Sequence, residues 1–465
     1  MGIRAVAFLG IASLLVFASC TPRAPSTSSP AGTGIARDPA LIGDNLTYDP
    51  RKPVNGREKI SITFWTQVEQ EPIFRELIED YAAIHPNVSV QLLSSGFNDH
   101  FNRLRIALAS GIGPDLFHLH NSYAASLLPY MEPYPNSVMA LEDLVKDFRQ
   151  VASHIVFGSK VYFIDTGLMT SCIYYNKAMW REAGLGEADF PKTWAQLRAV
   201  AKRLTRYDAA GKVIRAGFNP NGIGSSLLLA LELQAGQHLF AGDGPNRPLL
   251  DNPAAASAMA YLRDLYRVDR SADVHLPQSH ESFGVGSAAM IYAWGWANTW
   301  LKQNYTDLDF GVFPTPAWSA GTPPAYDRNN GESSMGVNIA SPKDRQAVAF
   351  DLINYFLSSK KYLVAMSLAF GVSPSKYSLD ADPALKSDPL LGTFAATLDR
   401  TEWPGALPSF YEETLTSDVV DAVVLDGKDI RSSLAAAEKK LIPLFRQSSF
   451  ANMERQYRFY SQFSD

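Results

Sequence analysis

Alternating and helically spaced apolar residues predict a series of strands and helices that begins near residue 59. One helix opens at Pro72 and stops at His85-Pro86, because apolar residues between them recur every three to four positions. A second helix carries Leu104, Ala107 and Leu108 on one face and ends at Gly111–Pro114. Period-two alternation or a short apolar run marks the strands. The predicted strands are Lys59–Trp65, Val88–Leu92 and Asp115–Leu119.

This order of strand, helix, strand, helix, strand predicts a parallel sheet covered by helices. Ligands bind beyond the carboxyl ends of such strands, which here are Trp65–Gln70 and His118–Ser122. Further along, Thr193 can cap another helix with Gln196 completing a capping box, and the part from Tyr411 onward is mostly helical in pattern. No internal repeat of 20–50 residues is visible.

The first twenty residues differ from the rest and predict an export signal. One positive charge, Arg4, precedes the apolar run Ala5–Phe17, which is too short to span a bilayer as a helix. Phe17-Ala18-Ser19-Cys20 resembles the lipobox of bacterial lipoproteins, although Phe17 stands where an aliphatic residue is usual. An ordinary signal-peptidase site is disfavoured because Phe17 is too bulky for it. We expect a signal peptide at 1–19 and lipid attachment at Cys20.

A tether is expected to follow the lipidated cysteine. In Thr21–Gly34, 11 of 14 residues are Pro, Ser, Thr or Gly, a composition that cannot bury a core. The flexible linker is predicted to cover residues 20–57. No other stretch approaches a transmembrane span, so the chain is expected to be a cell-envelope lipoprotein that is anchored to a membrane, on its periplasmic or extracellular face.

Composition excludes several classes of partner and site. The chain has 465 residues and a net charge of −5, which gives no positive excess to attract nucleic acid. Cys20 and Cys172 are the only cysteines, which excludes a disulfide scaffold and a four-thiolate zinc site. We read Cys172 as a buried small hydrophobic residue. The length suggests two or three domains.

Several short blocks, taken in order, resemble the family 1 extracellular solute-binding proteins of ABC importers, which include maltose-binding protein. Each block is weak alone, but their ordered set is specific, and it runs from about Ile60 to the C-terminus. The blocks are Ile62–Trp65, Ala109–Gly111, Gly113–Phe117, Tyr174–Lys177, Ala183–Leu185, Pro191–Trp194, Gly286–Met290 and Gly336–Asn338.

The resemblance implies an α/β fold of two lobes, the periplasmic-binding-protein fold, each lobe a mainly parallel sheet with helices on both faces. A ligand would lie in the cleft between the lobes and drive hinge closure. The chain would cross between lobes near Asp165–Thr170, Val312–Pro316 and Ala369–Pro374. Lobe 1 is expected to comprise 58–166 and 314–365, and lobe 2 to comprise 167–313 and 366–465.

Function follows from the same resemblance. The chain is expected to be a monomeric receptor, not an enzyme, that uses no cofactor or metal. It would capture a mono- or oligosaccharide and deliver it to an ABC permease. Met169 stands where some relatives hold an acidic sugar contact and Asp165 where a proline is common, so the sub-class of ligand stays open.

Aromatic side chains are the expected platforms for the C–H faces of a sugar. In the family, a tryptophan at the place of Trp294 stacks on sugar, and Trp296 lies beside it; Trp300 is expected to be core. Trp403, Phe410 and Tyr411 lie where the family supplies a late aromatic contact. Of these we select Tyr411, because it can both stack and hydrogen-bond.

Polar candidates lie at the two predicted strand ends. The candidates at the end of the first strand are Trp65, Gln67, Glu69 and Gln70. Glu69 could accept hydrogen bonds from sugar hydroxyls. The negative charge of Glu71 would instead stabilise the N-terminus of the following helix through its dipole. At the other strand end, His118, His120 and Asn121 sit where the family often places ligand contacts. Two histidines two apart could hold a metal, but hydrogen bonding by His120 and Asn121 is preferred. The other polar candidate is Glu332, in the turn-rich loop 329–333, while Asp115 is expected to be structural.

Two other functions stay open. The same fold could hold a non-sugar solute such as a polyamine, a phosphodiester or a ferric ion. Ferric sites use clustered tyrosines, and Tyr174-Tyr175 are the candidate ligands. A surface glycan hydrolase could use Glu69 and Glu332 as a carboxylate pair. Gly284–Ala289 fits G-x-G-x-x-A but lacks a strand-to-helix context, so a dinucleotide site is not expected.

Overall fold

In the computed structural model of the chain, the described residues are 38–149, 156–157, 160–242, 246–320, 327–328, 330–333, 335–395, 401–402, 404–405, 407–448, 450, 452 and 454. The chain separates into two units, Met1–Pro39 and Ala40–Asp465, and the second contains every named helix and strand. The predicted signal peptide, Cys20 and the tether Thr21–Gly34 lie outside the described residues. No helix in the described part is long and apolar enough to cross a membrane.

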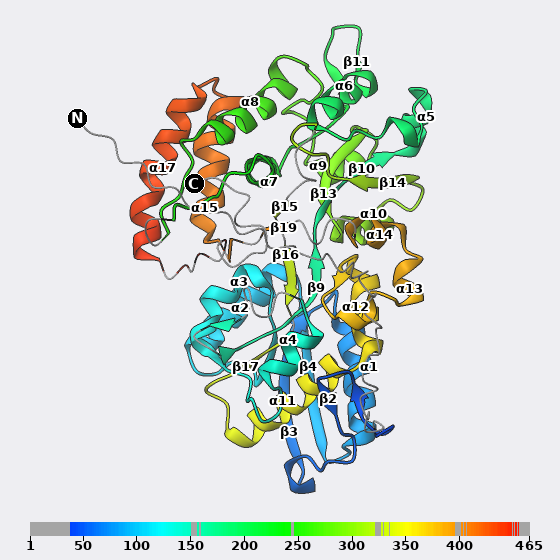
Figure 1. Ribbon diagram of the computed structural model, residues 1–465, viewed down its shortest axis with the longest axis vertical. Coiled ribbons are helices and arrows are strands. Elements are labelled where there is room, and N and C mark those ends of the chain that lie inside the picture. Colours follow the sequence, from blue (N-terminus) through cyan, green and yellow to red (C-terminus); the bar gives the residue numbers. More distant parts are fainter. Residues whose placement is uncertain are drawn as a thin grey trace, which may run out of the picture. The chain divides into compact units, whose positions relative to one another are not determined.

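Lobe 1 is built on a five-stranded sheet with the order β4-β3-β5-β17-β6 (Figure 1). β3 runs parallel to β4 and β5, as the sequence predicts, while β17 runs antiparallel to β5 and β6. The register pairs Ile62 with Val90 and Phe64 with Leu92, so the alternating apolar residues share a face. The strands are β3 (Ile60–Gln67), β4 (Val88–Ser95), β5 (Leu116–His118), β6 (Met131–Glu132) and β17 (Met335–Asn338).

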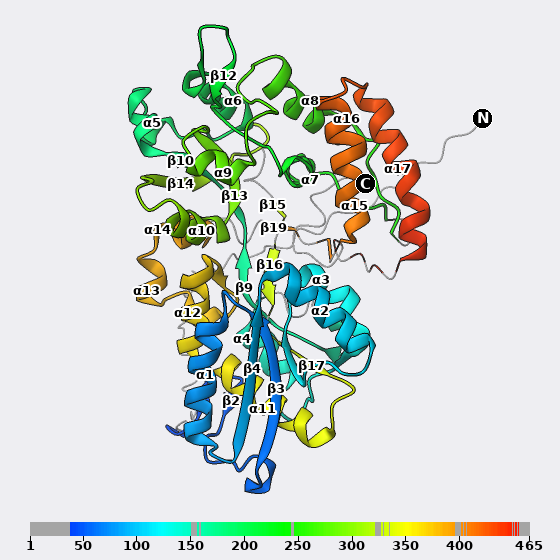
Figure 2. The ribbon, with the colours of Figure 1, turned by 180° about the vertical axis from the view of Figure 1, so that it is seen from behind.

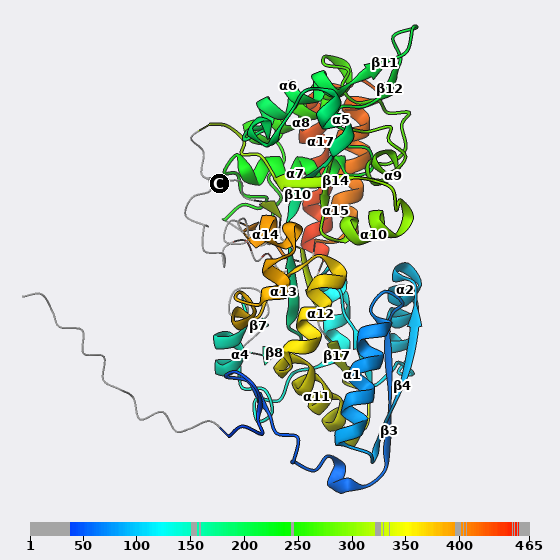
Figure 3. The ribbon, with the colours of Figure 1, turned by 90° about the vertical axis from the view of Figure 1, so that its right-hand side faces the viewer.

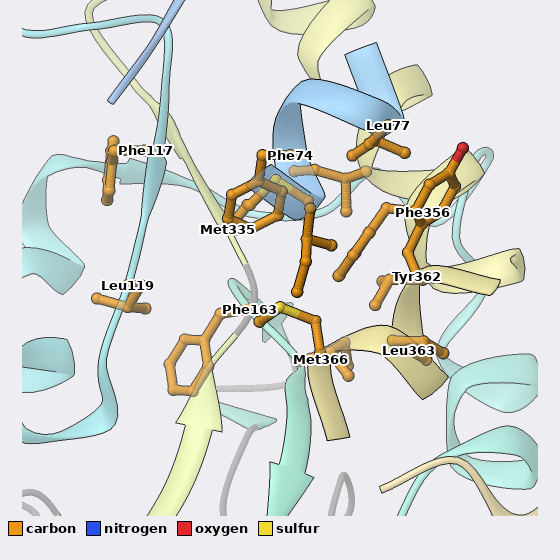
Figure 4. Packing of buried hydrophobic residues seen from close by; sticks show 14 of the residues in the cluster. Phe74, Leu77, Phe117, Leu119, Phe163, Met335, Phe356, Tyr362, Leu363 and Met366 are labelled. Atoms are coloured by element: carbon orange, nitrogen blue, oxygen red, sulfur yellow. The ribbon is translucent and has the colours of Figure 1, made fainter. Parts of the chain in front are cut away.

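Helices α1, α11 and α12 contact one another beside this sheet (Figure 3). Phe74 of α1 packs against Phe64 and Phe356, with ring centroids 4.9 and 5.7 Å apart, and Tyr362 and Leu363 complete the cluster (Figure 4). The apolar residues that recur at helical spacing in α1, such as Phe74, therefore lie in the lobe 1 core. The helices of lobe 1 are α1 (Glu71–Ile84), α2 (Phe97–Ala109), α3 (Asn121–Leu127), α4 (Leu141–Asp147), α11 (Lys343–Ser358) and α12 (Lys360–Phe370).

The predicted flexible linker is wrong for residues 40–57, which pack onto lobe 1. Leu46, Tyr48 and Val54 are buried in the lobe 1 core, and Asp147 at the end of α4 accepts hydrogen bonds from Leu46 N (2.9 Å) and Asn45 N (3.1 Å). Polar, Pro- and Gly-rich composition marks a tether only where apolar residues are missing, and this segment has three that can be buried. Its elements are β1 (Ile42–Gly43), β2 (Thr47–Tyr48) and the 3₁₀ helix η1 (Asn55–Arg57).

We expect removal of residues 1–57 to destabilise the protein, whereas removal of residues 1–39 should not. The longer deletion exposes the surface that three buried side chains cover, which is worth about 5 kcal/mol in total. It also removes the backbone amides of Asn45 and Leu46, which donate hydrogen bonds to Asp147. Thermal unfolding of the two truncated proteins measures the difference. Equal midpoints would show that the segment contributes nothing to the fold.

Lobe 2 contains a three-stranded sheet with the order β13-β10-β14, in which β10 pairs antiparallel with both neighbours. The expectation of a mainly parallel sheet is therefore wrong for this lobe. Every residue of β10 and β13 is buried, because each face of the sheet contributes to a different hydrophobic cluster. Such strands are continuous apolar runs, from which strand direction cannot be read. The strands are β10 (Ser171–Asn176), β13 (Met290–Trp294) and β14 (Phe310–Pro314).

Helices make up most of the rest of lobe 2. Thr193 caps α6 and forms the predicted capping box with Gln196. The helical elements are α5 (Lys177–Glu182), α6 (Trp194–Leu204), α7 (Gly224–Gln234), α8 (Pro253–Arg267), α9 (Ser279–Gly284), α10 (Trp296–Asn304), α13 (Pro383–Lys386), α14 (Pro389–Ala395), α15 (Ser409–Thr414), the π-helical segment η7 (Leu415–Asp421), α16 (Ala422–Val424) and α17 (Ile430–Gln447). Among the described residues, four short strand pairs lie outside the larger sheets: β1 with β2, β7 (Val156–Phe157) with β8 (Lys160–Val161), β11 (Arg206–Tyr207) with β12 (Val213–Arg215), and β15 (Asp327–Arg328) with β19 (Thr401–Glu402).

A small sheet with the order β16-β9-β18 connects the two lobes, and Figure 2 shows β9 and β16 between their elements. We call it the connecting sheet. Its strands are β9 (Asp165–Met169), β16 (Asn330–Ser333) and β18 (Ser373–Pro374). The first and third crossings thus lie where the sequence predicts them. The second prediction, Val312–Pro316, is wrong: β14 belongs to the lobe 2 sheet, and the chain returns through β16.

The predicted lobe boundaries need two further corrections. Residues just after Pro314 belong to lobe 2, because Ala317 exchanges backbone hydrogen bonds with Lys192 and Trp194. Lys376, which lies in the segment 366–465 predicted for lobe 2, is buried, and its ammonium group lies 3.0 Å from the Asp147 carboxylate of lobe 1. Both errors arise because sequence similarity marks the crossings only approximately.

Candidate functional site

The carboxyl ends of β3 and β5 meet at one edge of the lobe 1 sheet and bring Gln67 next to His118. The Gln67 side-chain amide donates to Nδ1 of His118 at 2.9 Å, and both side chains are buried. The neighbouring strands therefore do converge as predicted. The role predicted for Gln67 changes, however, because its amide binds a residue of its own lobe and lies beneath the surface.

The other candidates after β3 differ in exposure. Trp65 is half-buried, with the Arg103 guanidinium carbon 5.5 Å from its ring centroid, and Glu69 is exposed to solvent. Gln70 is only 1% exposed and lies within hydrogen-bond distance of the Thr66 hydroxyl. The prediction that Gln70 contacts ligand is thus contradicted: its side chain is buried where α1 begins. Glu71 starts α1 and accepts hydrogen bonds from Ser94 and Arg75, which lower its pKa, in line with a structural role.

His120 lies just beyond β5, where Phe97 at the start of α2 contacts it edge-on with ring centroids 5.4 Å apart. His120 is 7% exposed, and burial lowers its pKa to about 4, so the imidazole is neutral at physiological pH. Burial also lowers the pKa of His100, whose Nε2 donates to the backbone carbonyl of His118 at 3.0 Å. Asn121 begins α3, but its side chain lies outside the described residues.

Phe97 and His100 are members of this group that the sequence prediction missed. They lie at the start of α2, which follows the second parallel strand, β4. The rule that ligands bind beyond strand carboxyl ends could have identified them.

The buried neutral state of His120 predicts that the protein loses stability in acid. Its pKa is near 4 when folded and takes the ordinary value of 6.5 when unfolded. The unfolded chain therefore binds more protons as the pH falls from about 6.5 to 4, and the free energy of unfolding decreases by up to about 1.4 kcal/mol per pH unit over that window. Denaturant unfolding of His120→Gln and of Phe97→Leu at pH 4.5 to 7.5 measures this. His120→Gln should flatten the pH dependence and Phe97→Leu should keep it; the same slope in both variants would contradict the assignment.

Glu332 lies on the connecting sheet. It belongs to β16 and pairs with Gly167 of β9, and β16 contacts α3. The side chain of Glu332 lies outside the described residues. Met169, the last residue of β9, is buried in the lobe 2 core.

Trp294 ends β13 at the edge of lobe 2 next to the connecting sheet. It pairs with Ser171, the first residue of β10, and its carbonyl accepts a hydrogen bond from Tyr174 (2.9 Å). The backbones of Gly295 and Gly371 touch here: a Cβ on Gly295 would lie 1.8 Å from the Gly371 carbonyl oxygen. Trp294 is 8% exposed, and its indole Nε1 is buried without a hydrogen-bond partner among the described residues.

Trp296 and Trp300 follow on α10. Trp296 is 37% exposed, and the His280 ring stands edge-on to both tryptophans, with centroids 5.6 and 4.7 Å apart. Trp296 is therefore the accessible aromatic surface of this segment. Trp300 is partly buried against the core, as expected.

Tyr411 cannot serve as the predicted platform in this structure, because it is fully buried. Its ring packs against Phe240 and Phe445, with centroids 5.9 and 5.4 Å apart. Phe410 also packs against Phe445, and Trp403 lies outside the described residues. The helical pattern gave the position of Tyr411 but not the face of the helix on which it lies.

Other side chains are structural, and several of them count against the alternative functions. Asp115 accepts hydrogen bonds from Thr63 N (2.8 Å) and the Ser341 hydroxyl (2.7 Å), and Cys172 is buried. Tyr175 packs among Trp180, Phe190 and Phe313 in the lobe 2 core, which removes support for a ferric site. Gly284 ends a helix and Met290 starts a strand, the reverse of the dinucleotide-binding order. The described residues contain no group of three or more His, Cys, Asp or Glu that could hold a metal.

Comparison with known proteins places these features in a family. The model of the bacterial extracellular solute-binding proteins matches residues 65–362. The maltotriose-binding protein of Pyrococcus abyssi is 22% identical over 73% of this chain and 71% of its own length. The arabinooligosaccharide-binding protein of Halalkalibacterium halodurans is 22% identical over 76% of this chain and 77% of its own length.

Solved structures show the same fold. The maltose/maltodextrin-binding domain of Bdellovibrio bacteriovorus, bound to maltotriose, superposes with a TM-score of 0.68 at 18% identity, covering 83% of this chain and 100% of that chain. The two-lobe α/β fold is thereby confirmed. With a family match over most of its length, the chain belongs to the bacterial extracellular solute-binding proteins.

Proposed function

We propose that the chain is a receptor that captures an oligosaccharide between its lobes and delivers it to an ABC import permease. Its relatives include maltotriose-, arabinooligosaccharide- and diacetylchitobiose-binding proteins. The candidate residues suit an uncharged, hydroxylated ligand, because His120 is neutral and the aromatic surfaces of Trp65 and Trp296 are partly exposed.

The observation that supports this proposal most strongly is the indole Nε1 of Trp294. A buried donor without a partner costs about 1–3 kcal/mol, and a sugar oxygen placed against it would recover that cost. Trp294 pairs with Ser171, two residues after β9, and its neighbour Gly295 touches Gly371, two residues before β18, so a ligand held there would lie close to the connecting sheet.

Closure would follow from differential binding. A ligand that contacts the lobe 1 residues at His120 and the lobe 2 residues at Trp294 gains both sets of contacts only when the lobes close. Only this difference in affinity shifts the equilibrium toward the closed state. Rotation about β9 and its two partner strands would supply the hinge.

Isothermal titration of the full chain with maltotriose, arabinotriose and diacetylchitobiose tests the ligand class. We expect saturable heat with at least one of them. Heat with spermidine, ferric citrate or glycerophosphodiesters, and with no sugar, would replace this proposal by the non-sugar alternative.

The hydrolase alternative makes a separate prediction. Its carboxylates would be Glu69, which is exposed, and Glu332, which lies on the connecting sheet. Prolonged incubation with a bound oligosaccharide should leave the sugar intact if the chain is a receptor. Slow cleavage that Glu332→Gln abolishes would establish an enzyme instead.

We also propose that the mature chain is a monomeric lipoprotein anchored through Cys20. The family to which it belongs is extracellular, and one relative is named as a lipoprotein. Cys20→Ala should move the protein from the membrane fraction to the soluble fraction, because the lipid is its only expected anchor. Fractionation of cells that express either form measures this; retention of Cys20→Ala in the membrane would contradict lipid anchoring.

A further inference from the structure

Lobe 2 contains a half-enclosed pocket of about 300 Å³ that none of the roles above uses. It lies between the start of α7, the end of α8, the loop that precedes α9 and the segment η7–α16. Its volume lies at the lower end of the range for small-molecule sites. All of its lining residues fall within 220–278 and 416–425, so its shape depends on lobe 2 alone.

Close backbone approaches build this pocket. A Cβ on Gly224 would lie 2.9 Å from a methyl carbon of Val420, so the start of α7 rests directly on η7. Gly222 has φ +80° and lies against the Gln278 side chain. The π-helical segment brings the consecutive residues Val420 and Asp421 to the same pocket, and such segments often occur at functional sites.

Among the described residues that line the pocket, Asp421 is the only acidic one. Burial, and next the charge of Asp426, raise the pKa of its carboxyl. Within the described residues, no side chain donates a hydrogen bond to this carboxylate or pairs with it. The basic side chains nearby are engaged elsewhere: Arg267 donates to the carbonyls of Val424 and Leu425, and Lys428 pairs with Asp426. The half-buried carboxylate of Asp421 is therefore open to pairing with a cationic group of a ligand that enters the pocket.

Tyr266 supplies an aromatic wall close to that carboxylate. Burial, and next the charge of Asp421, raise the pKa of Tyr266, so the two groups interact. The Tyr266 hydroxyl donates to Asn221 Oδ1 at 2.7 Å, and Asn221 Nδ2 donates to the carbonyls of Asp273 and Leu276 at 2.9 Å. These bonds fix the ring. An aromatic ring and a carboxylate that line the same pocket favour an organic ammonium group.

The remaining walls distinguish an organic cation from a metal ion. Leu262, Leu276 and Val424 are apolar and suit methyl or methylene groups. The lining also holds neutral oxygens, but a calcium or magnesium site usually combines several oxygens with more than one carboxylate, whereas this lining has one carboxylate and Asn221 Oδ1 already accepts from Tyr266. We propose that this pocket binds a small organic cation whose ammonium group pairs with Asp421 and lies against Tyr266.

Titration of the full chain with choline and with its uncharged isostere 3,3-dimethylbutan-1-ol tests the proposal. The two have the same shape, so charge recognition should make choline bind at least ten-fold more tightly. Absence of choline binding at millimolar concentration, or equal binding of both compounds, would overturn the proposal.

Variants locate the site. Asp421→Asn should weaken choline binding at least ten-fold, whereas Asp418→Asn, on the same segment but paired with Lys440 at 2.7 Å, should not change it. Thr416→Phe fills the pocket from an exposed position and keeps the carboxylate, so it should also abolish binding, even if Asp421→Asn fails to fold. Unchanged choline binding in Thr416→Phe would contradict the site. Titration of Thr416→Phe with a bound sugar should match wild type, which separates this proposal from that of the carbohydrate receptor.

Discussion

Replacement of Trp294 by alanine is expected to reduce the affinity for the oligosaccharide by about 10- to 100-fold, which corresponds to about 1.4–2.8 kcal/mol. Two contributions are lost together: the aromatic surface for the sugar face, and the Nε1 donor that has no partner among the described residues. Isothermal titration with the sugar that binds wild type measures the change.

Because Trp294 is largely buried, its truncation also costs stability, about 3–5 kcal/mol for a tryptophan in a core. Trp294→Phe separates the effects, since it keeps a ring and removes the donor, and it should bind sugar with intermediate affinity. Trp180→Phe is the matched control: Trp180 is buried in the lobe 2 core and donates to the Gly186 carbonyl at 3.1 Å. If Trp180→Phe and Trp294→Phe weaken binding equally, the role of Trp294 is not specific.

Replacement of Lys376 by methionine is expected to lower the free energy of unfolding by about 3–5 kcal/mol, because it leaves a buried carboxylate without its cation. Lys376 is fully buried, and its ammonium group lies 3.0 Å from Asp147 and 3.7 Å from Asp44. Lys376 lies two residues after β18. Its ion pair with Asp147 therefore attaches the chain to lobe 1 just after the third crossing.

The double variant Lys376→Met/Asp147→Asn tests whether the loss comes from the unpaired charge. Asparagine keeps an acceptor for the Leu46 amide and removes the charge, so the double variant should be more stable than Lys376→Met alone. Lys361, which is half exposed and pairs with Glu76 and Asp80, gives the surface control: Lys361→Met should cost at most about 1 kcal/mol. Urea unfolding measures all three, and equal losses for Lys361→Met and Lys376→Met would contradict the assigned role of burial.

The parts of the fold that could be predicted from the sequence are those with a clear apolar period. β3, β4 and α1 were found because their apolar residues repeat at two or at three to four positions. The lobe 2 sheet could not be read in this way, because β10 and β13 are buried on both faces and carry no alternation. Their antiparallel pairing depends on contacts between segments more than 100 residues apart.

The candidate site was predictable in position but less so in side-chain direction. Strand ends correctly placed Gln67 beside His118, yet both are buried and bonded to each other. The burial of Tyr411 follows from Phe240 and Phe445, which approach it from distant parts of the chain. A sequence pattern places a residue on an element, whereas its exposure depends on tertiary partners that the pattern does not contain.

The central claim, that an oligosaccharide binds against Trp294, is tested most directly by the indole N–H resonance of this residue in ¹⁵N-tryptophan-labelled protein. Trp294→Phe assigns the signal, and the bound sugar from the titration panel is then added. We predict that this resonance shifts on binding, because Nε1 gains an acceptor, while that of Trp180, whose Nε1 already donates to Gly186, stays in place. A sugar that binds with saturable heat and leaves the Trp294 resonance unmoved would contradict the account.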